Sequence, residues 1–180
     1  MKDTWQVILA GEGGQGLIVA GILLAEAASV FENLNATQTQ SYGIASRGGF
    51  SQSEVVISAH EIIYPGVEDP DIVLALTQEA YDLYAPKLSE AALLIYDSDL
   101  VRPDPKPKAQ SFGFPLTETA RDLGRVGVTN LVALGAIQAL SGLIKLESLE
   151  RAITHRFGQK AAELNLKALG RGVELARAKA

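Results

Sequence analysis

The sequence predicts an α/β fold: a Rossmann-like, doubly wound sheet, mostly parallel, with a helical C-terminal part. Three observations support this prediction. The apolar run WQVILA at 5–10 is typical of a buried strand and leads through glycines into a long apolar helix at 17–31. Further strand-like and helical runs alternate up to residue 114. From Asn130 onward the pattern is helical. A chain of 180 residues with 47% apolar residues predicts a single domain spanning 1–180.

The individual elements follow from local patterns of apolar residues. The stretch 17–31 is apolar on nearly every face, so we expect neighbours on more than one side of this helix. Further strands are expected at 36–40, 50–58, 71–77, 91–96 and 109–114, and the run EIIYPG at 61–66 is compatible with another short one. Helices are expected at 78–88, at 116–123 and from 130 onward, with breaks near Lys145 and Phe157–Gly158.

The segment RPDPKPK at 102–108 contains three alternating prolines. Proline fixes its own backbone and lacks an N–H donor, so this segment predicts an extended surface crossing instead of a helix or a central strand. The chain after it is too small and too helical to form a second domain, which favours a crossing within one domain.

Composition excludes several classes of function. A net charge of −5 disfavours wrapping of nucleic acid, and the absence of cysteine removes disulfides, thiolate zinc sites and cysteine-ligated clusters from this chain. The N-terminus lacks the pattern of a signal peptide. The apolar stretch 128–144 is short and is interrupted by Asn130 and Gln138, which favours a buried helix over a membrane span. We therefore expect a cytoplasmic protein with no membrane contact.

The glycine loop GEGGQG at 11–16 matches the pattern G-x-G-x-x-G, and it lies between a predicted strand and a predicted helix. Glycines permit tight turns, and the free N–H groups at a helix N-terminus attract anions. A site for NAD usually has an acidic residue at the end of the second strand, but that strand ends in Thr39, Gln40 and Ser41. A loop for a phosphate or a partner protein is therefore favoured over NAD, and a tight turn without a ligand remains open.

A second loop surrounds Arg47 in the stretch SYGIASRGG, residues 41–49. Arginine offers several donors to phosphate or carboxylate, and adjacent glycines let backbone N–H groups approach the same anion. Because the loop follows the second predicted strand, we expect it beside the glycine loop, at the carboxyl ends of the strands. The alternative is a flexible surface loop with one solvated arginine.

Taken together, these motifs resemble a known family. The stretches GEGGQG, QTQSYGIASRGGFSQSEVVIS and DPDIVLALTQEAYD, in this order, closely resemble the gamma subunit of 2-oxoacid:ferredoxin oxidoreductases. The C-terminal stretches NLVALGAIQALSGLIKLESLERAI and FGQKAAELNLKAL are similar to the same family. One departure is Ile44, which stands where the family usually has proline.

The resemblance implies a multi-subunit enzyme that oxidatively decarboxylates a 2-oxoacid with coenzyme A, giving an acyl-CoA, carbon dioxide and reduced ferredoxin. It implies that thiamine diphosphate and iron–sulfur clusters belong to the alpha, beta and cluster-carrying subunits. This chain is then a gamma subunit with neither cofactor, inactive alone. The short separate chain with SYG and SRGG looks most like enzymes acting on 2-oxoglutarate, with pyruvate, branched-chain 2-oxoacids and indolepyruvate as competing substrates.

The predicted binding residues all lie in the two loops: Gly11, Gly13, Gly14, Gln15, Gly16, Ser46, Arg47, Gly48 and Gly49. No catalytic residue and no metal ligand is predicted. The loops either help to hold the phosphates of coenzyme A or pack against the alpha and beta subunits. When isolated, the chain could self-associate through the surface that the complex normally buries. The alternatives are a stand-alone nucleotide-binding domain and a purely structural scaffold subunit.

For the other polar residues we expect ordinary structural roles. His60 and His155 lie far apart in the sequence and are expected at the surface. Asp97 and Asp99 end a predicted strand, where paired acids are usually solvated or cap a turn. Asn130 either caps the helix that it begins or joins a small-residue face suited to tight packing.

Overall fold

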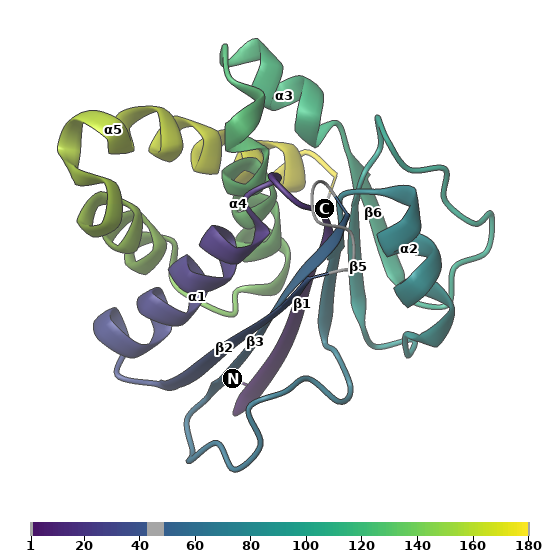
Figure 1. Ribbon diagram of the computed structural model, residues 1–180, viewed down its shortest axis with the longest axis horizontal. Helices are drawn as coiled ribbons and strands as arrows, with labels where there is room; N and C mark the ends of the chain where they lie inside the picture. Colours follow the sequence, from purple (N-terminus) through teal and green to yellow (C-terminus); the bar gives the residue numbers. More distant parts are fainter. Residues whose placement is uncertain (1, 43–48, 180) are drawn as a thin grey trace.

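The computed structural model describes residues 2–42 and 49–179 (Figure 1). Its centre is one six-stranded sheet with the strand order β2-β3-β1-β4-β5-β6. The strands are β1 (Thr4–Glu12), β2 (Asn35–Tyr42), β3 (Phe50–Ser58), β4 (Ile72–Ala75), β5 (Leu93–Asp97) and β6 (Gln110–Phe114). The strands expected from the sequence at these places are confirmed.

Four strands of the sheet, β1, β4, β5 and β6, are parallel neighbours, and β3 runs antiparallel between β1 and β2. The register pairs Val7 with Ile72 on one side of β1, and Glu12 with Phe50 on the other. The predicted α/β class with a mostly parallel sheet is confirmed. Strand β3 therefore lies between β2 and β1. In a dinucleotide-binding fold, by contrast, the second strand lies directly beside the first.

Helices cover both faces of the sheet unequally (Figure 1). One face carries α1 (Leu17–Phe31), α3 (Leu116–Asp122), α4 (Thr129–Ser141) and α5 (Leu146–Arg177), and the other carries α2 (Gln78–Tyr84) with a 3₁₀ turn at Ala85–Lys87. Side chains alternate between the two cores along β1, because successive residues of a strand point to opposite faces. Val7 and Leu9 join the larger core, whereas Ile8 and Ala10 join the core under α2.

The apolar stretch after residue 128 forms a buried helix, as expected, since Thr129–Ile137 are all buried in α4. This helix packs on α5 through glycines. A Cβ at Gly135 would collide with the Leu169 carbonyl oxygen, and a Cβ at Gly172 would collide with that of Val132. The two helix backbones therefore approach to a distance that only glycine permits.

The breaks in the C-terminal helices are where the sequence predicts them. Gly142, in the left-handed conformation with φ 63°, ends α4, and Lys145 is the N-cap of α5. Within α5, Gly158 has φ 69° and ψ 162°, which kinks the helix. Over the described residues, no helix combines the length and the apolarity that a membrane crossing requires.

The short strand considered at 61–66 does not form. The segment lies near β2, the edge strand of the sheet, but it contacts β2 through side-chain hydrogen bonds and forms no ladder with it. It is an irregular connection instead. The Pro65 carbonyl accepts a hydrogen bond from Thr37 Oγ1 at 3.2 Å, while the Ile63 side chain is 95% exposed.

Candidate functional site

The glycine loop joins β1 to α1 at the carboxyl edge of the sheet (Figure 1). Gly11 is buried within β1, and Gly14 and Gly16 have positive φ angles of 95° and 74°. These two angles lie in the left-handed region, which side chains other than glycine rarely adopt. The turn at the start of α1 therefore requires glycine at both positions.

Gln15 closes this turn from within. Its Oε1 accepts the Glu12 N–H at 2.7 Å, and its own backbone N–H donates to the Glu12 carbonyl at 3.2 Å. The same side-chain oxygen occupies the space that a Cβ at Gly11 would need. The Gln15 oxygen is thus committed to the loop, whereas the amide nitrogen of Gln15 makes no hydrogen bond to any other residue of 2–42 and 49–179.

The N-terminus of α1 is the part of the loop best suited to an anion. The N–H groups of Leu17, Ile18 and Val19 belong to the first helical turn, which supplies no acceptor for them. In the described part of the chain, no side chain caps this end and no acidic residue lies in its first turn. Aligned N–H groups at a helix N-terminus favour phosphate or carboxylate.

The two predicted loops meet in the structure. The Gly13 N–H donates to the Gly49 carbonyl at 2.9 Å, and Phe50 pairs with Glu12 in the sheet. The end of the Arg47 loop therefore lies against the glycine loop, as expected. Ser46, Arg47 and Gly48, which the sequence also predicts as binding residues, lie outside the described residues.

Histidine and acidic side chains are spread over the described ranges, 2–42 and 49–179. No group of three or more histidine, cysteine, aspartate or glutamate side chains lies close enough there to hold a metal ion. His60 and His155 are exposed, as predicted. His155 Nδ1 lies 2.5 Å from Glu26 Oε1, in a surface pair far from the loops in sequence.

For Asp97 the structure decides between the two expectations, because this side chain is fully buried and not solvated. Its Oδ2 accepts the Thr117 N–H at 3.0 Å and the Thr117 hydroxyl at 2.5 Å, and its Oδ1 accepts the Asp99 N–H at 3.0 Å. Burial raises the pKa of Asp97, and its hydrogen bonds from Thr117 oppose that rise. The capping alternative is confirmed: Asp97 holds the first turn of α3.

Asn130 is not the N-cap of α4, since that position belongs to Val128. Its side chain is buried and donates from Nδ2 to the Gly16 carbonyl at 3.0 Å. Sequence reasoning missed this contact because 114 residues separate the two partners. The only signal was a polar residue at the start of an otherwise apolar helix.

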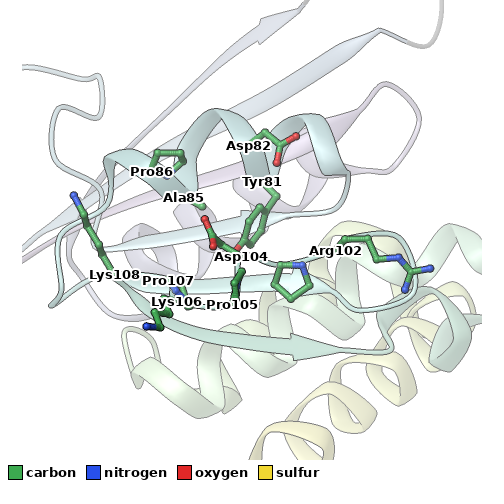
Figure 2. Close-up of a pocket in the computed structure, with 11 residues that line it drawn as sticks. Tyr81, Asp82, Ala85, Pro86, Arg102, Asp104, Pro105, Lys106, Pro107 and Lys108 are labelled. Carbon is green, nitrogen blue, oxygen red and sulfur yellow. The ribbon is translucent and has the colours of Figure 1, made fainter.

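The proline segment 102–108 borders a surface hollow of about 620 Å³ beside α2 (Figure 2). Its backbone is tied to α2 by three hydrogen bonds. The Arg102 N–H donates to Gln78 Oε1 at 2.7 Å, and the Arg102 carbonyl accepts from Gln78 Nε2 at 3.2 Å. The Asp104 N–H donates to the Tyr81 hydroxyl at 3.1 Å. The predicted extended surface crossing is confirmed. The lining mixes prolines with charged side chains of both signs.

A scan against models of known protein families matches residues 6–175 to the family described as pyruvate ferredoxin/flavodoxin oxidoreductase. The chain belongs to this family. The resemblance that the two loop motifs predict is confirmed, and the alternative of a stand-alone nucleotide-binding protein gains no support from any of the relatives described below.

Relatives of similar length are subunits of 2-oxoacid oxidoreductases. The chain is 41% identical over 180 residues to the 2-oxoglutarate synthase subunit KorC of Methanocaldococcus jannaschii, covering 98% of this chain and 96% of that protein. Among solved structures, the gamma subunit of a keto/oxoacid ferredoxin oxidoreductase from Geobacter sulfurreducens is 43% identical, with a TM-score of 0.85 and coverage of 97% and 99% of the two chains.

Other relatives contain the same fold within a longer polypeptide. The structure of 2-oxoglutarate:ferredoxin oxidoreductase from Magnetococcus marinus, with 2-oxoglutarate, coenzyme A and succinyl-CoA bound, matches with a TM-score of 0.90 and 27% identity. That match covers 99% of this chain but 32% of the longer one. A family member is thus either a separate subunit or one segment of a larger chain.

Proposed function

We propose that this chain is the gamma subunit of a 2-oxoglutarate:ferredoxin oxidoreductase and that its two loops help to bind coenzyme A. The complete enzyme converts 2-oxoglutarate and coenzyme A to succinyl-CoA and carbon dioxide, and passes two electrons to ferredoxin. Thiamine diphosphate and the iron–sulfur clusters belong to the alpha, beta and cluster-carrying subunits. The gamma subunit is inactive alone.

Sequence identity supports 2-oxoglutarate as the substrate. The chain is 41% identical to the 2-oxoglutarate synthase subunit of Methanocaldococcus jannaschii, compared with 32% to the common gamma subunit of the pyruvate and ketoisovalerate oxidoreductases of Pyrococcus abyssi. Both alignments span most of the two proteins. The side chain of the 2-oxoacid is expected to contact mainly other subunits. The support for 2-oxoglutarate therefore comes from sequence similarity and not from a pocket in this chain.

The hydrogen bond from the Gly13 N–H to the Gly49 carbonyl carries the proposal for coenzyme A. It brings the N-terminus of α1 and the end of the Arg47 loop to one place, on a protein whose net charge is −5. Backbone N–H groups at a helix end and an arginine are the donors that phosphates prefer. Coenzyme A is rich in phosphate, and a relative of the same fold has been solved with coenzyme A bound.

A second role, in assembly, is favoured by the relatives with longer chains. The fold that covers 99% of this chain makes up 32% of the Magnetococcus marinus chain. A domain that is covalently joined to the rest of an enzyme in one relative is expected to bind the corresponding subunits as a separate chain in another. The loop glycines would then allow close approach of a partner backbone.

An Arg47→Ala variant in the assembled, anaerobic complex separates the two roles. We expect the KM for coenzyme A to rise about tenfold, which corresponds to about 1.4 kcal/mol, while the KM for 2-oxoglutarate and the subunit composition stay unchanged. Arg156→Ala, an exposed arginine on α5, is the matched control. Loss of the other subunits would support the assembly role instead, and an unchanged KM with intact assembly would exclude Arg47 from both roles.

Capture of the tagged chain from its own cells under anaerobic conditions tests the identity of the complex. We expect a thiamine diphosphate-binding subunit and a ferredoxin-like cluster subunit to be recovered with it, identified by mass. Recovery of the chain alone would contradict the proposal that it is a subunit of a larger oxidoreductase.

A further inference from the structure

Asn130 is a buried amide that is fixed at both ends. It is the second residue of α4, and it is 3% exposed. Its Nδ2 donates to the Gly16 carbonyl at 3.0 Å, and its Oδ1 accepts the Leu131 N–H at 3.0 Å. A buried amide with a partner on each side has one orientation, so the Gly16 carbonyl has a fixed donor facing it.

This contact sets the direction of a whole peptide group. In the planar trans peptide between Gly16 and Leu17, the carbonyl and the N–H point in opposite directions. Asn130 holds the carbonyl, which also accepts the Ala20 N–H at 3.0 Å. The Leu17 N–H therefore points away from Asn130 and out of the N-terminus of α1, together with the other N–H groups of the first turn that have no acceptor within the helix.

Gly16 and Asn130 are also matched in shape. A Cβ at Gly16 would lie 2.6 Å from Asn130 Nδ2, so the amide occupies the space that the missing side chain leaves. Gly14 and Gly16 both have positive φ angles, and glycines in solution sample many other conformations. Without a contact from outside the loop, ordering this turn around a ligand would cost conformational entropy.

We propose that Asn130 is a positioning residue for coenzyme A, which holds the turn from Gly14 to Leu17 in the conformation that presents the N–H groups of α1 to a phosphate. This inference rests on the proposed function. Asn130 touches no ligand itself and acts through Gly16. Its effect is on the affinity for coenzyme A and not on the chemical step, which the other subunits perform.

Two variants remove the contact in different ways. Asn130→Asp keeps the shape of the side chain but replaces the donor that faces the Gly16 carbonyl with an oxygen, so packing is retained. Asn130→Ala removes the side chain altogether. The matched control is Gln138→Ala, because Gln138 Nε2 donates to the Ile144 carbonyl at 3.2 Å from the opposite end of the same helix. It loses a hydrogen bond of the same chemical type about 12 Å further along the helix axis.

The assembled enzyme provides the first measurement. For both Asn130 variants we expect the KM for coenzyme A to rise about five- to tenfold, with kcat and the KM for 2-oxoglutarate within about twofold of the wild type. Gln138→Ala should leave all three values unchanged. A merely structural role for Asn130 would make the control and the variants behave alike, or would lower the amount of assembled enzyme without changing the KM.

Amide hydrogen exchange in the isolated chain provides a measurement that does not involve coenzyme A. We expect Asn130→Asp to speed exchange of the amides from Gly13 to Ile18, whereas Gln138→Ala does not. Unchanged exchange in this segment would overturn the inference, because the turn would then keep its conformation without the hydrogen bond from Asn130.

The outcomes also distinguish this inference from the proposed function. If Arg47→Ala raises the KM for coenzyme A and the Asn130 variants do not, the loops bind coenzyme A but Asn130 does not position them. If neither raises it, the role in coenzyme A binding fails and the inference fails with it. A rise in both, together with faster exchange in the loop, supports the inference.

Discussion

The backbone N–H of Gly13 donates to the carbonyl oxygen of Gly49 over 2.9 Å, and this bond joins two loops that are 36 residues apart in the chain. It places Gly49, at the end of the Arg47 loop, against the glycine loop that leads into α1. Neither loop has a strong motif by itself, since a glycine pattern and a lone arginine are both common. Their contact is the physical basis of the anion site that we propose, because it joins the ends of two loops that both carry donors for phosphate.

This bond predicts a contrast between neighbouring amides. The Gly13 N–H has an acceptor, whereas the Gly14 N–H has no backbone acceptor among the described residues. We expect the Gly13 amide to exchange with solvent at least about tenfold more slowly than the Gly14 amide, because exchange requires the bond to open. Exchange measured by NMR on the isolated chain tests this. Equal rates would mean that the two loops separate readily when partner subunits are absent.

Glu12 predicts an electrostatic effect of opposite sign to that of Arg47. Its side chain is exposed within the glycine loop, where a carboxylate repels phosphate. In the assembled enzyme, Glu12→Gln should lower the KM for coenzyme A about twofold at low ionic strength, and the difference should fade with added salt. Glu90→Gln is the control, since Glu90 is exposed before β5, at the opposite edge of the sheet. A higher KM for Glu12→Gln would contradict an anion site in this loop.

The close contact between α4 and α5 predicts that the stability of the protein depends strongly on the size of residues 135 and 172. Gly135→Ala and Gly172→Ala each place a methyl group against a backbone carbonyl, and each should lower the free energy of unfolding by about 1–3 kcal/mol. Gly170→Ala, on the same helix α5 but facing open space, should be neutral or stabilising by up to about 1 kcal/mol. Urea unfolding measures all three. Similar losses at positions 170 and 172 would show that helix propensity, and not close packing, governs this contact.

Asp97 predicts a pH-dependent term in stability. Its burial raises the pKa in the folded protein above the ordinary value of 3.8, so the folded state binds this proton more tightly than the unfolded chain does. The stability that this proton contributes is fully present below pH 3.8 and is lost as the pH rises through the raised pKa. The advantage of the wild type over Asp97→Asn in free energy of unfolding should therefore shrink as the pH rises.

Urea unfolding at several pH values between about 4 and 8 measures this difference. Asp99→Asn is a useful second variant, because the negative charge of Asp99 contributes to the raised pKa of Asp97. Removing it should move the loss of stability to lower pH. A constant difference between the wild type and Asp97→Asn across the range would show that the pKa of Asp97 is the same in the folded and unfolded states.

The sequence by itself determined the class of fold and most of its elements. The helix at 17–31 was predicted with the bounds that it has in the structure, because an apolar run that follows a glycine turn is a strong local signal. The breaks at Lys145 and Gly158 were predicted for a similar reason, since backbone preferences of single residues act locally. The family also followed from sequence alone, because the order of several motifs is far more specific than any one of them.

Only the tertiary structure decided how distant parts meet. The insertion of β3 between β1 and β2 depends on which strand edges pair, and a pattern of alternating residues does not specify its partner. The burial of Asp97 and the contact of Asn130 with Gly16 depend on segments 20 and 114 residues away. Periodicity and motifs record what a residue prefers within its own segment, whereas hydrogen bonds between segments form only once packing has brought them together.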